Sequence, residues 1–259
     1  MVVGRSRLLA ALCAALSLLW GCGGGSDGSG QPMPGTSAPI AGAPDASAPV
    51  ASVPAVAPGT WAVIGSSSAA GAGAPDGQGW AAQLRSAYAA QGVTVRNLAV
   101  GGTVTYQALP TGSPVANGRP ATDPSSNVTA ALATGARLVL VSFPTNDTAL
   151  GYSVSETVGN LRTIRAAALD SGVAVMLLSA QPRDLSTALL ARMPELDAQL
   201  AAMAGDCFVP VREALAGADG KLSPLYDSGD GVHPNAAGHA VIADRVKSVI
   251  EAGKCVRLG

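Results

Sequence analysis

Groups that could carry out acyl transfer stand in two short segments of the sequence. Residues 65–73 read GSSSAAGAG and contain three consecutive serines, Ser66–Ser68. Residues 230–235 read DGVHPN, in which Asp230 precedes His233 by three residues. A serine hydroxyl becomes a nucleophile when an imidazole takes its proton, and a carboxylate commonly orients that imidazole. The spacing therefore predicts that Asp230 orients His233 beside one of the serines, without deciding which one.

Two further segments supply groups that could stabilise the negative charge formed in such a reaction. GGT at 101–103 offers the bare backbone N–H of Gly102, and PTND at 144–147 offers the side-chain amide of Asn146. Acyl transfer forms an oxyanion, which preorganised hydrogen-bond donors stabilise. We therefore expect Gly102 and Asn146 to line the same site as His233.

Phosphate binding and metal binding are alternative uses of these segments, and the sequence favours neither. Gly71 and Gly73 begin a dinucleotide-type pattern, but Asp76 takes the place of its third glycine, and the Gly-Lys-Ser/Thr of a P-loop does not occur. The chain has two histidines, and Asp230 and His233 have no obvious third ligand beside them. The sequence therefore predicts no metal and no cofactor.

Three other polar residues near these segments are expected to support the structure. Asp227 is a second carboxylate that could face His233, but its separation of six residues makes it the second choice. His239 lies inside the last predicted helix beside Gly238, and Asp147 is expected to brace its loop.

Stretches typical of strands alternate with stretches typical of helices through residues 61–253. The strands are largely apolar, which is typical of a parallel sheet buried on both faces. The sequence thus predicts an α/β fold in three layers, with a five-stranded parallel sheet between two layers of helices. Ligands bind outside the carboxyl ends of the strands in such sheets. Strands are expected at 61–65, 93–100, 136–143, 173–180 and 207–211, and helices at 79–92, 155–172, 186–205 (kinked or broken at Pro194) and 235–253.

Residues 1–22 have the pattern of an export signal. Arg5 and Arg7 precede an apolar run at 8–20, which is shorter than the roughly 20 residues of a membrane-spanning helix. The run leads into LLWGC at 18–22, which resembles the bacterial lipobox and predicts lipidation of Cys22. We expect an exported lipoprotein that faces the periplasm or the cell surface. An ordinary secretion signal with an incidental cysteine is the alternative.

The rest of the chain divides into a linker and one domain. Residues 23–58 consist mainly of Gly, Ser, Pro and Ala, which is typical of a flexible linker because such a stretch buries little apolar surface. Residues 59–259 remain, about 200 residues, which suffices for one well-buried domain. The net charge is −1 and no basic cluster occurs, so the sequence does not favour a nucleic-acid partner.

Cys207 and Cys255 are the only cysteines outside the predicted signal. Export leads to an oxidising compartment, in which a pair of cysteines commonly forms a disulfide. We therefore expect a disulfide between them, and two buried free thiols are the alternative.

Four of these segments, in this order, resemble the sequence blocks of the SGNH (GDSL-type) hydrolase family. They are GSS at 65–67 for Gly-Asp-Ser, NLAVGG at 97–102 for the glycine block, PTND at 144–147 for Gly-x-Asn-Asp, and DGVH at 230–233 for Asp-x-x-His. Two positions depart from the family pattern. Ser66 stands where the family has Asp, and Pro144 replaces a glycine and favours an extended Phe143.

The resemblance implies a flavodoxin-like α/β/α fold and a role for each site residue. It implies that Ser67 is the nucleophile, that His233 is the general base and then the acid, and that Asp230 orients the imidazole. It also implies an oxyanion hole formed by the backbone N–H groups of Ser67 and Gly102 and by the side chain of Asn146.

These expectations together indicate an exported serine esterase for short acyl esters. The segments that flank the site, 103–126 and 147–153, are polar, and Tyr106, Leu109 and Leu150 are scattered apolar residues in them, too few to bury a long acyl chain. The ester substrate is expected to have a small or carbohydrate-like alcohol. Two alternatives stay open, namely an acyltransferase that passes the acyl group to a carbohydrate, and an envelope- or polysaccharide-binding module without turnover.

Overall fold

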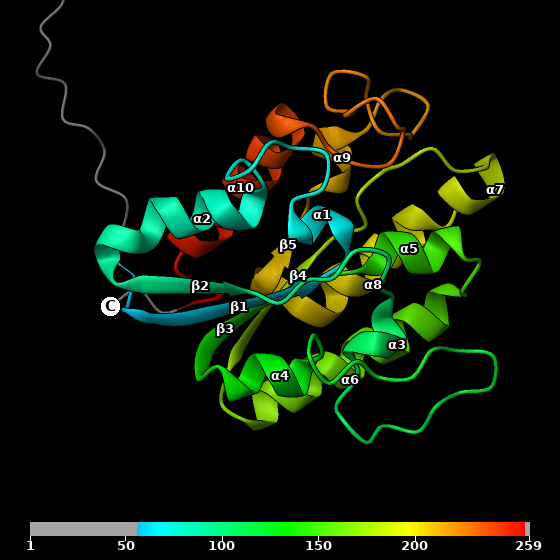
Figure 1. Cartoon of the computed structure of the whole chain (residues 1–259). Helices are drawn as coiled ribbons and strands as arrows, with labels where there is room; N and C mark the ends of the chain where they lie inside the picture. The colour runs from blue at the N-terminus through cyan, green and yellow to red at the C-terminus, as the bar shows by residue number, and fades with distance from the viewer. Residues whose placement is uncertain (1–55, 257–259) are drawn as a thin grey trace, which may run out of the picture. The chain divides into compact units, whose positions relative to one another are not determined.

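The computed structural model describes residues 56–256. The predicted signal with its lipidation residue Cys22, and most of the predicted linker at 23–58, lie outside the described residues. A parallel sheet of five strands forms the centre of the described part, which confirms the predicted sheet. The strands are β1 (Gly59–Gly65), β2 (Val93–Asn97), β3 (Ala136–Ser142), β4 (Ala174–Leu178) and β5 (Phe208–Val209), as Figure 1 shows.

The order of the strands creates a topological switch point beside β1. The sheet runs β2-β1-β3-β4-β5, so the chain leaves β1 toward one side and returns to its other side as β3. This is the strand order of flavodoxin, in which the loops after the two central strands diverge and leave a crevice at their carboxyl ends. The fold therefore directs attention to the residues that follow β1 and β3.

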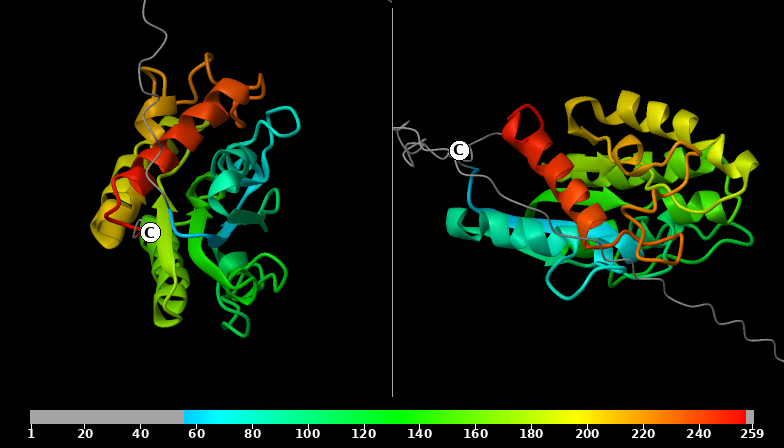
Figure 2. Two further views of the ribbon diagram at one scale, coloured as in Figure 1. Left: turned by 90° about the vertical axis from the view of Figure 1, so that its left-hand side faces the viewer. Right: turned by 90° about the horizontal axis from the view of Figure 1, so that it is seen from above.

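Alternate residues of each strand face opposite layers of helices. Trp61 of β1 packs in one core cluster and Ile64 of the same strand packs in the other. The helices on the first face are α2 (Trp80–Tyr88) and α10 (Ala236–Glu251), and those on the second are α4 (Val128–Ala133), α6 (Val154–Asp170) and α8 (Met193–Ala204), as Figures 1 and 2 show. None of the helices between residues 56 and 256 combines the length and apolar character needed to cross a membrane.

Pro194 breaks the helix predicted at 186–205. The segment forms two helices, α7 (Thr187–Leu190) and α8, and Pro194 is the second residue of α8. Proline is tolerated in the first turn of a helix because its missing N–H has no intrahelical partner there. Of the two outcomes expected for this proline, the structure shows the break.

Several strands are shorter than predicted, and short helices follow some of them. β2 ends at Asn97 and β4 ends at Leu178, so residues 98–103 and 179–184 are loops at the strand ends. Within residues 56–256, five α-helices of four to six residues were not predicted, because they are too short to show an apolar period. They are α1 (Ser67–Ala70), α3 (Thr105–Ala108), α5 (Pro144–Ala149), α9 (Arg212–Leu215) and the α4 helix described above.

A disulfide joins Cys207 to Cys255, whose Cα atoms are 4.8 Å apart. Cys207 immediately precedes β5, and Cys255 follows α10. The bridge closes a sequence separation of 48 residues, for which the chain-entropy model gives about 4 kcal/mol of stabilisation. It lies at the amino end of β5, and thus at the end of the sheet opposite to the carboxyl ends of the strands.

Candidate active site

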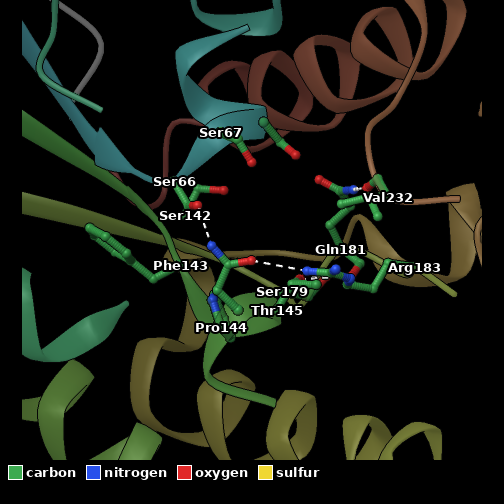
Figure 3. Close-up of a pocket in the computed structure, with 12 residues that line it drawn as sticks. Ser66, Ser67, Ser142, Phe143, Pro144, Thr145, Ser179, Gln181, Arg183 and Val232 are labelled. Atoms are coloured by element: carbon green, nitrogen blue, oxygen red, sulfur yellow. Dashed lines mark hydrogen bonds between the residues drawn. The ribbon is translucent and has the colours of Figure 1, made fainter. Parts of the chain in front are cut away.

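A small cavity lies at the carboxyl ends of β1, β3 and β4, next to the switch point (Figure 3). The loops that follow these strands supply most of its wall, and Val232 comes from the segment before α10. The lining residues are Ser66, Ser67, Ser68, Ser142, Phe143, Pro144, Thr145, Asn146, Ser179, Gln181, Arg183 and Val232.

The structure brings Ser67, His233 and Asp230 into one hydrogen-bonded chain. Ser67 is the first residue of α1, directly after the N-cap residue Ser66, and its Oγ lies 2.9 Å from His233 Nε2. The other ring nitrogen of His233, Nδ1, lies 2.6 Å from Asp230 Oδ2. This contact selects Ser67 among the three consecutive serines, a choice that spacing alone left open.

Asp230 is held as an ionised carboxylate. Its Oδ1 accepts the backbone N–H groups of His233 and Val232, each at 2.8 Å. The backbone N–H of His233, followed by the ring of His233, holds the pKa of Asp230 well below its usual range. An ionised carboxylate only accepts hydrogen bonds, so Nδ1 of His233 carries a proton. In the neutral ring Nε2 is then free to accept the hydroxyl proton of Ser67.

The other two candidates near this segment have structural contacts. Asp227 accepts the backbone N–H groups of Gly229 and Gly231 and so braces the loop, whereas Asp230 is the partner of the imidazole. His239 is fully buried, and its Nδ1 accepts the N–H of Trp80 at 3.2 Å. Its Nε2 lies 2.9 Å from the carbonyl oxygen of Ala72, and burial lowers the pKa of this histidine.

The side-chain amide of Asn146 is held at both ends. Its Nδ2 donates to Ser66 Oγ at 2.6 Å and to the carbonyl oxygen of Thr103 at 3.0 Å. Its Oδ1 accepts a hydrogen bond from Nη1 of Arg183 at 3.1 Å. In this structure both amide hydrogens therefore have partners, and Ser66, the partner of one of them, lines the cavity.

Pro144 has a different effect on the chain from the one predicted. Phe143 is not extended, since its ψ is −33°, and Pro144 is the first residue of α5. The proline begins a helix where its missing N–H costs no hydrogen bond, and this outweighs the preference of Phe143 for an extended backbone. Asn146 thus projects from the first turn of a helix, a more rigid support than the predicted loop.

The loop after β2 carries Gly102 across the end of β1. Val100 donates its N–H to the carbonyl oxygen of Gly65 at 3.1 Å, and the hydroxyl of Thr103 donates to the carbonyl oxygen of Val100 at 2.7 Å. Gly101 lies beside the nucleophile candidate, because a Cβ atom there would be 3.8 Å from Ser67 Cβ. Gly102 follows in the left-handed conformation, with φ 79° and open space around it.

The glycine-rich bend after the serines makes room for His233. Gly73 has φ 92°, and a Cβ atom there would lie 2.3 Å from the carbonyl oxygen of Pro234 and 2.8 Å from His233 Cβ. No side chain fits this gap without displacing the histidine segment. Gly73 is therefore required for packing against the histidine segment. This accounts for a glycine here without a phosphate-binding motif.

Two residues of the site were missed by sequence reasoning. Arg183 follows β4 and contacts Asn146, and the rule that ligands bind at strand ends would have indicated the loop at 179–184. Ser66 was considered as one of three candidate nucleophiles and as a departure from a pattern, but not as the residue whose hydroxyl accepts from Asn146. Within residues 56–256 no group of three or more His, Cys, Asp or Glu side chains is placed to hold a metal ion.

Asp147 braces the site from inside the fold. It is completely buried in α5 and accepts hydrogen bonds from the N–H of Thr105, at 3.1 Å, and from the Thr105 hydroxyl. Asn160 of α6 donates to the same hydroxyl at 2.9 Å. Burial raises the pKa of Asp147 to about 7, against the opposing effect of the bonds from Thr105.

This raised pKa predicts a pH dependence of stability. The folded state holds the proton of Asp147 up to about pH 7, whereas the unfolded chain releases it near its ordinary value of 3.8. The free energy of unfolding should therefore fall as pH rises from about 4 to 7, with a contribution on the order of 1 kcal/mol per pH unit. Urea unfolding of Asp147→Asn across this range should show a flatter slope. Asp170→Asn, at the exposed end of α6, should keep the wild-type slope; equal slopes in all three proteins would contradict the assignment.

Comparison with solved structures identifies several with the same fold. The psychrotrophic esterase EstA from Pseudoalteromonas sp., in a form inhibited by monoethylphosphonate, is 16% identical with a TM-score of 0.55 over 74% of this chain and 97% of that one. A GDSL-like lipase from Bacteroides thetaiotaomicron is 19% identical, with a TM-score of 0.52 over 75% and 88% of the two chains. A member of the lipolytic G-D-S-L family from Veillonella parvula is 17% identical, with a TM-score of 0.54 over 73% and 97%.

Comparison of the sequence, rather than of the structure, shows the family to which the chain belongs. No curated protein matches the chain. The model of the GDSL-like lipase/acylhydrolase family matches residues 63–241, a span that begins in β1 and ends in α10 and includes every site residue described above. The chain therefore belongs to the GDSL-like lipase/acylhydrolase family.

Proposed function

We propose that this protein is a serine esterase that hydrolyses short acyl esters through an acyl-enzyme on Ser67. The observation that carries the proposal is the chain of hydrogen bonds from Ser67 through His233 to Asp230. Membership of an acylhydrolase family supports it.

In the proposed mechanism Ser67 Oγ attacks the ester carbonyl carbon while His233 Nε2 takes the hydroxyl proton. The bond from this carbon to the alcohol oxygen then breaks, and His233 returns the proton to the leaving alcohol. Water attacks the acyl-enzyme, gives a proton to His233, and releases the acid as Ser67 regains its proton. Asp230, which stays ionised, stabilises the imidazolium in both halves of the reaction.

The oxyanion would be stabilised by the N–H groups of Ser67 and Gly102 and by the amide of Asn146. Ser67 begins α1, where the first N–H groups of a helix have no intrahelical partner. The amide hydrogen of Asn146 that now bonds to Ser66 would exchange this partner for the oxyanion. The bonds from Asn146 to Thr103 and Arg183 would persist, so the amide need not reorient.

The wall of the cavity favours a short acyl group. Most of its lining residues have hydroxyl or amide side chains, and Gln181 donates to the carbonyl oxygen of Val232 at 2.6 Å. The apolar residues suggested by the sequence do not form a channel, because Leu109 is buried in the core and Leu150 is 62% exposed. The hydroxyl of Tyr106 bonds to a carboxylate oxygen of Glu156 at 2.7 Å.

We also propose that the protein is exported, with Cys22 as the lipid-anchored residue. The disulfide between Cys207 and Cys255 supports export, since such bridges persist in oxidising compartments. Incorporation of a labelled fatty acid into the full chain, and its loss in Cys22→Ala, tests the anchor.

Labelling with a phosphonate tests the nucleophile. A fluorophosphonate should form one adduct on Ser67, located by peptide mapping, because only this serine lies beside the imidazole. Ser67→Ala should lose the adduct and at least about 10⁴-fold of the turnover. Ser68→Ala is the matched control and should keep both. An adduct on Ser66 or Ser68, or turnover by Ser67→Ala, would refute the proposed mechanism.

The contact between Gly73 and the histidine segment predicts a second loss of activity. Gly73→Ala should lower kcat by about 10²-fold, because displacement of His233 by an ångström breaks its contact with Ser67. Gly77→Ala is the matched control, since Gly77 has φ 79° in the same segment and nothing within 4 Å of an added Cβ atom. Both variants should lose some thermal stability through backbone strain, but only Gly73→Ala should lose turnover. Equal kcat values in the two variants would show that the close approach does not position the histidine.

A series of esters with one leaving group tests the acyl preference. Specificity constants should be highest from acetyl to about butyryl and then fall. A buried methylene contributes about 0.8 kcal/mol, but the cavity offers little apolar surface against which a longer chain could be buried. Constants that rise steadily to ten carbons would indicate a lipase instead. Release of free acid distinguishes hydrolysis from transfer to a sugar acceptor, and absence of turnover throughout would favour the binding module.

A further inference from the structure

Arg183 is the only charged residue among those that line the cavity (Figure 3). Its loop is fixed on two sides. The hydroxyl of Thr145 donates to the carbonyl oxygen of Gln181 at 2.7 Å, and the N–H of Asp184 donates to the carbonyl oxygen of Gly231 at 2.6 Å. The loop that carries Arg183 is therefore attached to the same two segments that carry Asn146 and His233.

The charge of Arg183 is not neutralised within residues 56–256, where it forms no ion pair. The adjacent carboxylate, Asp184, pairs with Lys221 at 2.5 Å, and Asp230 pairs with His233. Asp227, the third carboxylate of the neighbouring segments, accepts the backbone N–H groups of Gly229 and Gly231, so all three have other partners. A cation left without a counterion beside a cavity attracts an anionic ligand.

The hydrogen-bonding capacity of Arg183 is mostly unused. A guanidinium has five N–H donors in a planar fork that matches carboxylate and phosphate. One of these donors reaches Asn146 Oδ1, and Nε is buried without a hydrogen-bond partner. Because Nε is enclosed by the protein, an anionic group would bind the remaining N–H groups of the two η nitrogens, which have no other hydrogen-bond partner within residues 56–256.

We propose that Arg183 forms a subsite for an anionic group of the substrate, so that the preferred esters carry a carboxylate or phosphate near the ester bond. This inference rests on the proposed esterase function and specifies its substrate class. The anion can belong to the acyl part, as in a dicarboxylic half-ester, or to the alcohol part, as in a phosphorylated alcohol. Both place negative charge within the same cavity, so the charge is the shared feature and the experiment separates its source.

Two matched pairs of substrates test the subsite. Monoethyl succinate and its neutral isostere ethyl succinamate differ in charge on the acyl side. 1-Acetylglycerol 3-phosphate and 1-acetylglycerol differ in charge on the alcohol side. In at least one pair, wild-type kcat/KM should favour the anionic member by at least about tenfold, and added salt should reduce this ratio because salt screens the attraction.

Variants of Arg183 show whether this residue causes the preference. Arg183→Met should bring the ratio of the preferred pair close to one, and Arg183→Lys should keep part of it. Both variants should also turn over neutral esters more slowly through the lost bond to Asn146, so the ratio is the readout. Arg162→Met removes the same charge from an exposed position on α6 and should leave the ratio unchanged.

Binding measurements separate this inference from the proposed function. In the Ser67→Ala protein, calorimetric titration should show monoethyl succinate or the glycerol phosphate ester binding more tightly than its neutral partner, and Arg183→Met in that background should abolish the difference. A ratio near one in both wild-type pairs, or a preference that survives Arg183→Met, would overturn the subsite while leaving the esterase proposal intact. Loss of all turnover with a binding preference that depends on Arg183 would overturn only the esterase proposal.

Discussion

The central sheet has to be covered on both faces, and this constraint decides where reactive groups can lie. Trp61 and Ile64 of β1 face opposite cores, so the strand itself has no free side for a polar site. The carboxyl ends of β1 and β3 approach so closely that a Cβ atom on Gly65 would lie 2.6 Å from the carbonyl oxygen of Ser142. This close approach brings the segment of Ser67 next to the segment of Asn146, because each follows its strand directly.

The loops at these strand ends are held mainly by backbone groups. Asp227 and Asp230 each accept two backbone N–H groups of their own loop, which shapes the segment that presents His233. Asn235 caps α10 by accepting the N–H of Gly238 and donates to the carbonyl oxygen of Asp227. These bonds hold the histidine segment in one conformation, so the ring of His233 keeps one orientation. The same bonds leave little room to substitute the residues around it. Gly73 shows how tight this arrangement is, since even a methyl group does not fit beside the segment.

Three ionisable side chains at or near the site differ in their burial and in their hydrogen-bond partners. Asp230 is half-exposed and stabilised as an anion by N–H donors, so its role depends on hydrogen bonds more than on burial. Asp147 is completely buried, and burial raises its pKa despite its bonds from Thr105. Arg183 lies between these extremes and has one bond to Asn146 and no carboxylate partner in the described part of the chain. Protein groups thus provide hydrogen-bond donors to both carboxylates, whereas no carboxylate of the described residues balances the charge of Arg183.

The sequence alone determined the five strands, the longer helices and the order of the blocks. Apolar strands that alternate with helices predicted the three-layer fold, because burial on both faces requires that pattern, and the family resemblance pointed to Ser67, Asn146, Asp230 and His233. The alternation could not determine the strand ends or the one-turn helices, since a few residues carry no detectable period. Pro144 illustrates this limit, because the same residue is compatible with an extended chain and with the start of a helix.

The tertiary structure decided which groups meet. It placed Ser67 rather than Ser66 or Ser68 at His233, and Asp230 rather than Asp227. It also placed Arg183 at the amide of Asn146, and Gly73 against the histidine segment. Asp230 and His233 are three positions apart, but the other contacts join residues that are between 37 and 166 positions apart along the chain. They depend on the order of strands in the sheet and on gaps of a few ångströms between loops, which local propensity and spacing do not specify.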